Sequence, residues 1–110
     1  MAYKYDLKIE QGATFALEIV CKDDAGAVLP LTGCVAAAQV RYKISDASPA
    51  ATFTTYVDEA NGIVTLSLSA SDTSGLSRTY GVWDANIEWP GGSVQRLVEG
   101  AVEISLEVTR

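Results

Sequence analysis

The sequence predicts an all-β fold, an antiparallel sandwich or small barrel of seven to eight short strands with at most one helical turn. Apolar and polar residues alternate with a period of two through most of the 110 residues, which is the pattern of strands with one buried and one solvated face. Turn-forming clusters separate these stretches at a spacing of about ten residues. A chain of this length and apolar content buries enough surface for one core, so we expect a single domain over residues 1–110.

The first strand is predicted over residues 3–10, where odd positions are apolar or aromatic and even positions are polar or charged. Tyr3 and Tyr5 open this strand. Large amphipathic rings on a terminal strand favour contact with a neighbouring subunit, so both are candidate interface residues. A second strand is predicted over residues 14–21. The cluster at residues 23–26 predicts a turn, because aspartate bonds to its own backbone and glycine accepts a positive φ.

The segment around Pro30 is predicted to be an edge or connecting piece, since proline cannot donate to a central ladder. Residues 34–42 are ambiguous, because three consecutive alanines suit a helix, whereas the polar alternation beyond them favours a strand. We interpret this stretch as a strand. Its methyl groups let another layer or another subunit approach closely, which makes three residues candidates for an interface: Ala36, Ala37 and Ala38.

A β-branched and aromatic strand is predicted over residues 52–57. The Asn-Gly pair that ends residues 58–62 is the strongest short hairpin signal, and the alternating stretch after it is the returning strand. One helical turn follows, with Ser69 or Ser71 as its N-cap and Gly75 as its stop.

The last two strands are predicted over residues 80–89 and 94–104, joined by a tight Pro-Gly-Gly-Ser turn. The alternation of the final strand slips near Gly100, which indicates a bulge or a close approach of another backbone. Leu106 and Val108 are predicted to extend this strand further.

The charge balance argues against several classes of function. Fourteen acidic residues stand against eight scattered basic ones, for a net charge of -6, so we expect no nucleic-acid partner. The chain has no histidine, which removes the commonest general base and the commonest transition-metal ligand. It also has no nucleophile elbow and no phosphate-binding glycine loop. We therefore expect no enzyme, no catalytic residue, no metal, no cofactor and no small-molecule substrate.

The two cysteines, Cys21 and Cys34, are expected to be reduced core residues rather than a disulfide. Free cysteine is among the most buried residue types, and the sequence carries no export signal. No apolar stretch approaches the ~20 residues of a membrane span, and the first residues lack an apolar signal core. We expect a soluble chain that folds in a cytoplasm and has no membrane partner.

Aromatic side chains are candidates for a ligand-binding face, since such rings stack on sugars in many sandwich modules. At least one tryptophan is expected in the core, because both alternate in phase with Ala85 and Ile87. A polar row on the opposite strand face is interpreted as a solvated sheet surface: Asp84, Asn86 and Glu88. The aromatic candidates are Tyr56, Tyr80, Trp83 and Trp89.

Five segments, taken in order, carry a family resemblance. They are residues 7–15, which contain Ile-x-Gln-Gly-x-Thr-Phe; residues 24–26 followed by 29–33, which end in Leu-Thr-Gly; residues 39–41; residues 61–69, which begin Asn-Gly-Ile-Val-Thr-Leu; and residues 96–104, which contain Leu-x-Glu-Gly-x-Val. In this order they resemble the small Ig-like virion proteins of tailed bacteriophages, including the N-terminal module of baseplate upper proteins. The resemblance spans nearly the whole chain, and the order of the segments carries it rather than any single motif.

The resemblance implies an Ig-like β-sandwich without an active site that docks to or bridges other virion proteins. The expected attachment is at a tail, neck, baseplate or fibre, with further contacts between copies of the chain. A capsid decoration, or cement, protein is the alternative within this class, and a receptor- or glycan-binding sandwich module is the alternative from another class. The expected location is the virion, assembled in the host cytoplasm.

Overall fold

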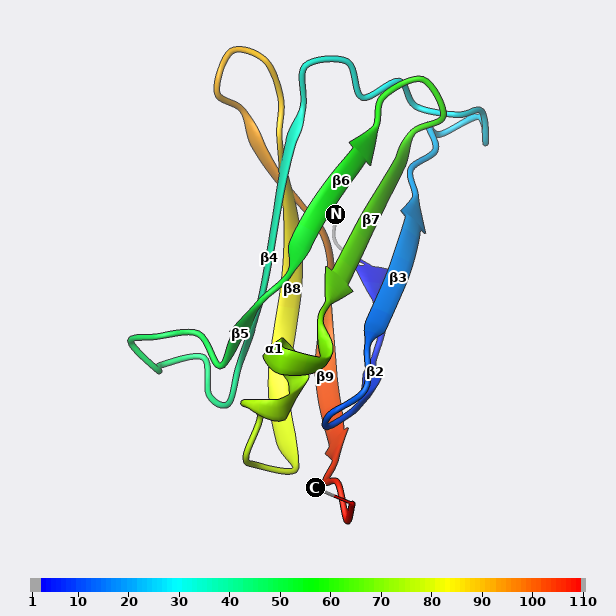
Figure 1. The fold of residues 1–110 in the computed structure, drawn as a ribbon. Coiled ribbons are helices and arrows are strands. Elements are labelled where there is room, and N and C mark those ends of the chain that lie inside the picture. The colour runs from blue at the N-terminus through cyan, green and yellow to red at the C-terminus, as the bar shows by residue number, and fades with distance from the viewer. Residues whose placement is uncertain (1–2, 110) are drawn as a thin grey trace.

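The computed structural model describes residues 3–109, which form nine strands, one short helix and the turns between them (Figure 1). The strands lie in two sheets that share one hydrophobic core. The elements, in chain order, are β1 (Tyr3–Lys4), β2 (Leu7–Glu10), β3 (Phe15–Val20), β4 (Val35–Arg41), β5 (Ala51–Thr52), β6 (Thr54–Asp58), β7 (Ile63–Leu68), α1 (Ala70–Ser74), β8 (Tyr80–Glu88) and β9 (Val94–Ser105).

The prediction of a mostly β fold is confirmed, but the large sheet is mixed rather than antiparallel. Its order is β1-β9-β8-β4-β5, with β2 also paired to β9, and both β1 and β2 run parallel to β9. The small sheet, β3-β7-β6, is antiparallel throughout. Residue alternation reports which face of a strand is buried and says nothing about the direction of the neighbouring strand, so it does not reveal the parallel pairs.

The nine strands within residues 3–109 exceed the expected seven to eight because two predicted strands are each divided. The first is interrupted at Tyr5, although β1 and β2 keep one continuous register against β9. The Tyr5 carbonyl accepts a hydrogen bond from the indole Nε1–H of Trp83 at 2.8 Å. The N–H of Ala101 donates to a carboxylate oxygen of Asp6 at 2.9 Å. The side chains of Trp83 and Asp6 thus bond to backbone groups of Tyr5 and Ala101, and the regular backbone ladder is interrupted between β1 and β2.

Gly100 makes this arrangement sterically possible. It stands opposite Trp83 in the β8–β9 pair, and a Cβ at this position would overlap the carbonyl group of Tyr5. The predicted close approach of another backbone at Gly100 is therefore confirmed. The irregularity in the β8–β9 register lies earlier in β9, at Leu97, which has no partner on β8.

The second divided strand passes from one sheet to the other at Phe53. β5 pairs with β4 in the large sheet, whereas β6 pairs with β7 in the small sheet. The Phe53 ring is buried between the sheets, and its centroid is 6.1 Å from those of both Phe15 and Trp83. Aromatic pairs at such separations are worth about 0.5–1.5 kcal/mol beyond the area they bury, so Phe53 anchors the crossing.

The core is formed by alternate residues of strands from both sheets. On β7 and β8 the alternation is complete, since every inward side chain is buried and the residues between them are half-buried or exposed. This confirms the predicted strands at residues 63–69 and 80–89. The inward side chains of these two strands are Val64, Leu66, Leu68, Trp83, Ala85 and Ile87.

The predicted helical turn and hairpin glycine are confirmed. The hydroxyl of Ser69 accepts the N–H of Asp72, and the Asp72 carboxylate accepts the N–H of Ser69, so α1 begins with a capping box. The helix ends at Gly75. Gly62, in the hairpin between β6 and β7, has a φ of 64°, which glycine adopts without strain.

The final strand ends earlier than predicted, at Ser105. Leu106 and Val108 lie beyond it and are exposed, so the predicted extension of the strand through them is wrong. The N–H of Glu107 donates to the Oε1 of Gln11 at 2.7 Å. This bond to a side chain holds the segment after β9 against the connection between β2 and β3.

We expect the substitution Gly100→Ala to lower the free energy of unfolding by about 1–3 kcal/mol, because the added methyl group must displace the Tyr5 carbonyl from Trp83. Urea denaturation followed by tryptophan fluorescence measures the change. Gly75→Ala is the control, since its backbone is in the right-handed helical region and the nearest atom to an added Cβ is at 3.5 Å. Equal stability of the two variants would contradict the conclusion that the Tyr5 carbonyl can approach only because residue 100 has no side chain.

Candidate functional site

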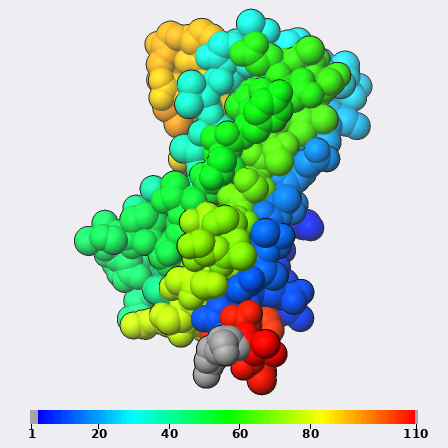
Figure 2. All heavy atoms as spheres, viewed as in Figure 1, coloured from blue at the N-terminus to red at the C-terminus, as the bar shows by residue number. Residues whose placement is uncertain are grey.

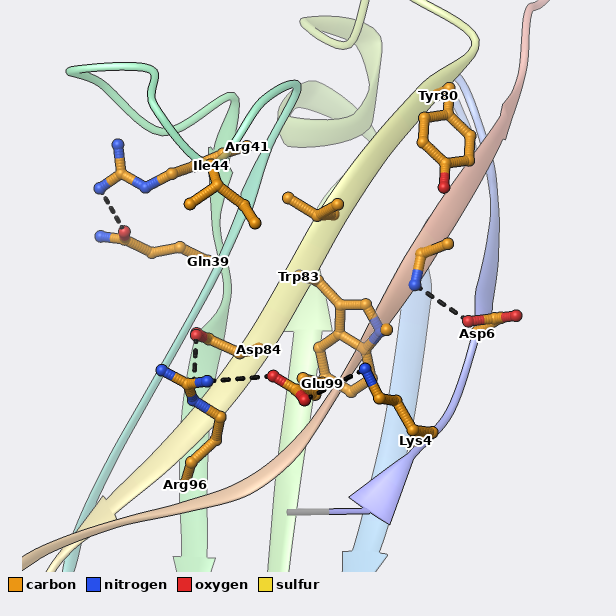
Figure 3. Close-up of a pocket in the computed structure, with 13 residues that line it drawn as sticks. Lys4, Asp6, Gln39, Arg41, Ile44, Tyr80, Trp83, Asp84, Arg96 and Glu99 are labelled. Carbon is orange, nitrogen blue, oxygen red and sulfur yellow. Dashed lines mark hydrogen bonds and ion pairs between the residues drawn. The ribbon is translucent and has the colours of Figure 1, made fainter.

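A hollow of about 520 Å³ opens on the outer face of the large sheet (Figure 3). Its walls come from four strands and from the loop that follows β4. Charged and aromatic side chains line it, the main ones being Lys4, Arg41, Tyr80, Asp84, Arg96 and Glu99.

Strand register brings the charged side chains of the hollow together. On β8 the inward residues fill the core, so the alternating residues Tyr80, Val82 and Asp84 face outward. Asp84 pairs with Gln39 of β4 on one side and with Glu99 of β9 on the other. Lys4 of β1 pairs in turn with Glu99. One cross-strand row therefore joins side chains from four strands.

Arg96 and Lys4 pair with the carboxylates of this row, and Figure 3 shows the contacts as dashed lines. The Nε of Arg96 lies 3.5 Å from Oδ2 of Asp84, and its Nη1 lies 3.0 Å from Oε1 of Glu99. The Nζ of Lys4 lies 3.2 Å from Oε2 of Glu99. Hydrogen bonds from Lys4 and then from Arg96 hold the pKa of Glu99 below its ordinary value. Glu99, with two cationic partners, is the centre of this ion-pair network.

Arg41 shapes the wall of the hollow beside the loop after β4. Its Nη1 donates to the carbonyl of Asp46 at 2.7 Å and its Nη2 to the Oε1 of Gln39 at 3.0 Å. These bonds hold the loop against the sheet. At the rim, Ile44 is 85% exposed and Tyr80 is 60% exposed. The hollow thus combines a charged floor with an exposed apolar rim.

The structure separates the candidate interface residues into two groups. Tyr3 and Tyr5 are 80% and 55% exposed and are available for contact. Ala36 and Ala38 point into the core and are covered by the small sheet. The layer that packs closely on their methyl groups is therefore part of the same chain. Ala37, on the opposite face of β4, is exposed. The interface interpretation is therefore wrong for Ala36 and Ala38.

The aromatic candidates for sugar stacking do not form one face. The Trp83 ring is 3% exposed and its N–H is bonded, as expected of a core tryptophan. Trp89 is partly buried against the core. Tyr56 and Tyr80 are exposed, but Tyr56 faces outward from the small sheet and Tyr80 lines the hollow on the large sheet. The two exposed rings of this set, Tyr56 and Tyr80, therefore lie on different sheets and share no stacking surface.

The turn carboxylates bond to local backbone. One oxygen of Asp23 accepts the N–H groups of Ala25 and Ala27, both at 2.9 Å, which is how the predicted turn is closed. Within residues 3–109 no group of three acidic or cysteine side chains is placed to hold a metal ion.

Cys21 and Cys34 are both buried, and no disulfide joins them. Burial raises the pKa of both thiols, and the charge of the neighbouring Cys34 raises that of Cys21 further. Because the thiolate is the reactive form, these cysteines are poor nucleophiles in the folded protein.

Sequence reasoning missed the ion-pair network. The alternation identifies Lys4 and Asp84 as polar residues of strands and predicts a solvated surface for the Asp84 row. The missing information was strand order, since only the pairing of β1, β9 and β8 brings Lys4, Glu99 and Asp84 into one row.

No protein-family model and no curated protein matches this chain in sequence. The single helix of residues 3–109, α1, has five residues, far fewer than a membrane-spanning helix needs.

We expect the substitution Lys4→Ala to raise the pKa of Glu99 toward its ordinary value, because it removes the contact that lowers this pKa most. An NMR titration of the Glu99 side-chain carboxyl carbon measures the midpoint. Since folding lowers this pKa, the associated stabilisation is present above the unfolded-state pKa and is lost as the pH falls through the folded-state pKa. Lys8→Ala, on β2, is the control, and an unchanged midpoint in Lys4→Ala would refute the network.

We expect Cys21 and Cys34 to react with an aromatic disulfide reagent much more slowly in the native protein than in urea, because both are buried with raised pKa values. Absorbance of the released thiolate measures both rates. Reaction of either cysteine at the rate of the unfolded chain would show that its burial is incomplete.

Proposed function

We propose that the two sheets form an Ig-like β-sandwich and that the protein is a non-enzymatic virion structural protein of a tailed bacteriophage. In this role it docks to or bridges other virion proteins at a tail, neck, baseplate or fibre attachment. The proposal combines the order of segments that resembles small Ig-like virion proteins with the surface described above.

The observation that carries the proposal is the hollow with its exposed apolar rim. Ile44 and Tyr80 leave large apolar surfaces in solvent beside the ion-pair network of Glu99. Tyr3 and Tyr5 do the same on the segment whose Lys4 lines the hollow. Exposed aromatic and aliphatic anchors next to ordered charges are what a protein partner needs for affinity and for a defined orientation.

The alternatives differ in what they require of the surface. A capsid decoration protein would use the same kind of contact at another place in the particle. A glycan-binding module would need stacking rings on one face, and the buried Trp83 and the opposite placement of Tyr56 and Tyr80 do not favour it.

Mass spectrometry of purified phage particles tests the proposal. We expect peptides of this chain at a fixed copy number relative to a major virion protein, and in tail rather than capsid fractions after the particles are dissociated. Recovery in the capsid fraction would support the decoration alternative over tail attachment. Absence from purified particles of a phage that expresses the chain would overturn the proposed function.

We expect Tyr80→Ser to reduce incorporation into particles by about tenfold or more, since an aromatic anchor in an interface commonly contributes about 2 kcal/mol. Tyr56→Ser is the matched control, because Tyr56 is equally prominent on the outer face of the other sheet. Equal incorporation of the two variants would exclude the hollow as the docking surface.

A further inference from the structure

The outer strands of the two sheets differ in how well their edges are protected. β2 carries Lys8 and Glu10, and charged side chains on an edge discourage further pairing. β5 has only two residues. β6 is tied to the other sheet, because the hydroxyl of Thr55 donates to the carbonyl of Ala36 at 3.1 Å. Each of these three edges has a device that limits strand addition.

β3 is less protected, since Glu18 is its one charged residue whereas the shorter β2 has two. Its six residues, Phe15–Val20, contain no proline, glycine or lysine, and within residues 3–109 its strand partner is β7 alone. In Figures 1 and 2 this strand forms the right-hand margin of the small sheet. No hydrogen bond of the described residues, apart from those to β7, reaches its backbone. An edge of this kind is a template for another strand.

The direction of the free backbone groups follows from the pairing with β7. The N–H of Cys21 donates to the carbonyl of Gly62 at 2.7 Å, in register with the β3–β7 pair. In an antiparallel pair the bonded residues alternate, so the residues two and four positions before Cys21 also face β7. The backbone groups of Ala16, Glu18 and Val20 therefore face the free edge.

The inward side chains of β3 are incompletely buried. Phe15, Leu17 and Ile19 are half-buried, although the β7 residues opposite them are at most 2% exposed. Burial thus falls off from β7 toward the free edge of β3. On the outer face of the same strand, Val20 is 53% exposed. A further strand at this edge would cover these apolar side chains and would satisfy the backbone groups.

We propose that the free edge of β3 pairs antiparallel with β3 of a second copy of this chain, about a two-fold axis. A strand is complementary to itself in this arrangement, since both copies direct the same residues inward. A register centred on Leu17 places Phe15 opposite Ile19, and it places Glu18 opposite Ala16 rather than opposite its own copy. The single charge of the strand is then diagonal to its own copy rather than directly opposite it, and the two small sheets become one continuous six-stranded sheet.

The pairing rests on the proposed function in one respect: it supplies the surface for the contacts between copies that this function includes. It is tested on the purified full chain, so a monomeric protein would overturn the edge pairing and leave incorporation into virions to be decided by the particle experiment. The Tyr80→Ser variant acts on the other sheet and reports on a different contact.

Sedimentation velocity over a concentration series tests the pairing. We expect a reversible dimer for the natural sequence, and we expect Glu18→Pro to weaken it by about tenfold or more, because proline removes an N–H that donates in two symmetric bonds. Glu18→Ala is the matched control, since it removes the charge and keeps the N–H, and its dimer should be retained. Thermal unfolding checks that both variants fold.

A second pair of variants covers the case in which Glu18→Pro does not fold. Val20→Lys places a charge on the free edge and should weaken the dimer, whereas Val94→Lys changes an equally exposed valine on β9 and should leave it intact. A monomer at all concentrations, or a dimer that persists unchanged in both Glu18→Pro and Val20→Lys, would overturn the proposal.

Discussion

The indole N–H of Trp83 is a buried donor, and the large sheet depends on how it finds an acceptor. An unpaired buried group of this kind costs about 1–3 kcal/mol. Its acceptor is the carbonyl of Tyr5, which comes from the opposite end of the sequence and reaches the indole across Gly100. The ring of the same tryptophan contacts Phe53, where the chain crosses between sheets. One side chain therefore ties the first strands to β8 and links both sheets.

The outer surface is organised by the same contact. The carbonyl of Tyr5 accepts the indole N–H of Trp83, and the residues on either side of Tyr5, Lys4 and Asp6, line the hollow. Asp6 accepts the N–H of Ala101, and Lys4 pairs with Glu99. The bond between Tyr5 and Trp83 therefore helps to hold the segment that brings Lys4 to Glu99.

Much of the fold is predictable from local pattern, and the candidate site is not. The strands, the Asn-Gly hairpin and the capped helix follow from alternation and turn chemistry, which act over a few residues. The division at Phe53 and the burial of Ala36 depend on the second sheet, so a single strand does not reveal them. The network around Glu99 depends on which strands are neighbours. Strand order is set by pairings between distant segments, and the alternation of residues within a strand does not predict it.

The parallel pairing of β1 and β2 with β9 sets an order of events during synthesis. Asp6 and Ala101, which bond to each other, are 95 positions apart. The hairpins β6–β7 and β8–β9 join strands that are adjacent in the sequence and close short loops, whereas the first strands must wait for nearly the whole chain before they have a partner. β1 and β2 are therefore synthesised long before their partner strand β9 and are among the last elements to be ordered. In the meantime their two tyrosines and unpaired backbone are open to chaperones and to other nascent chains.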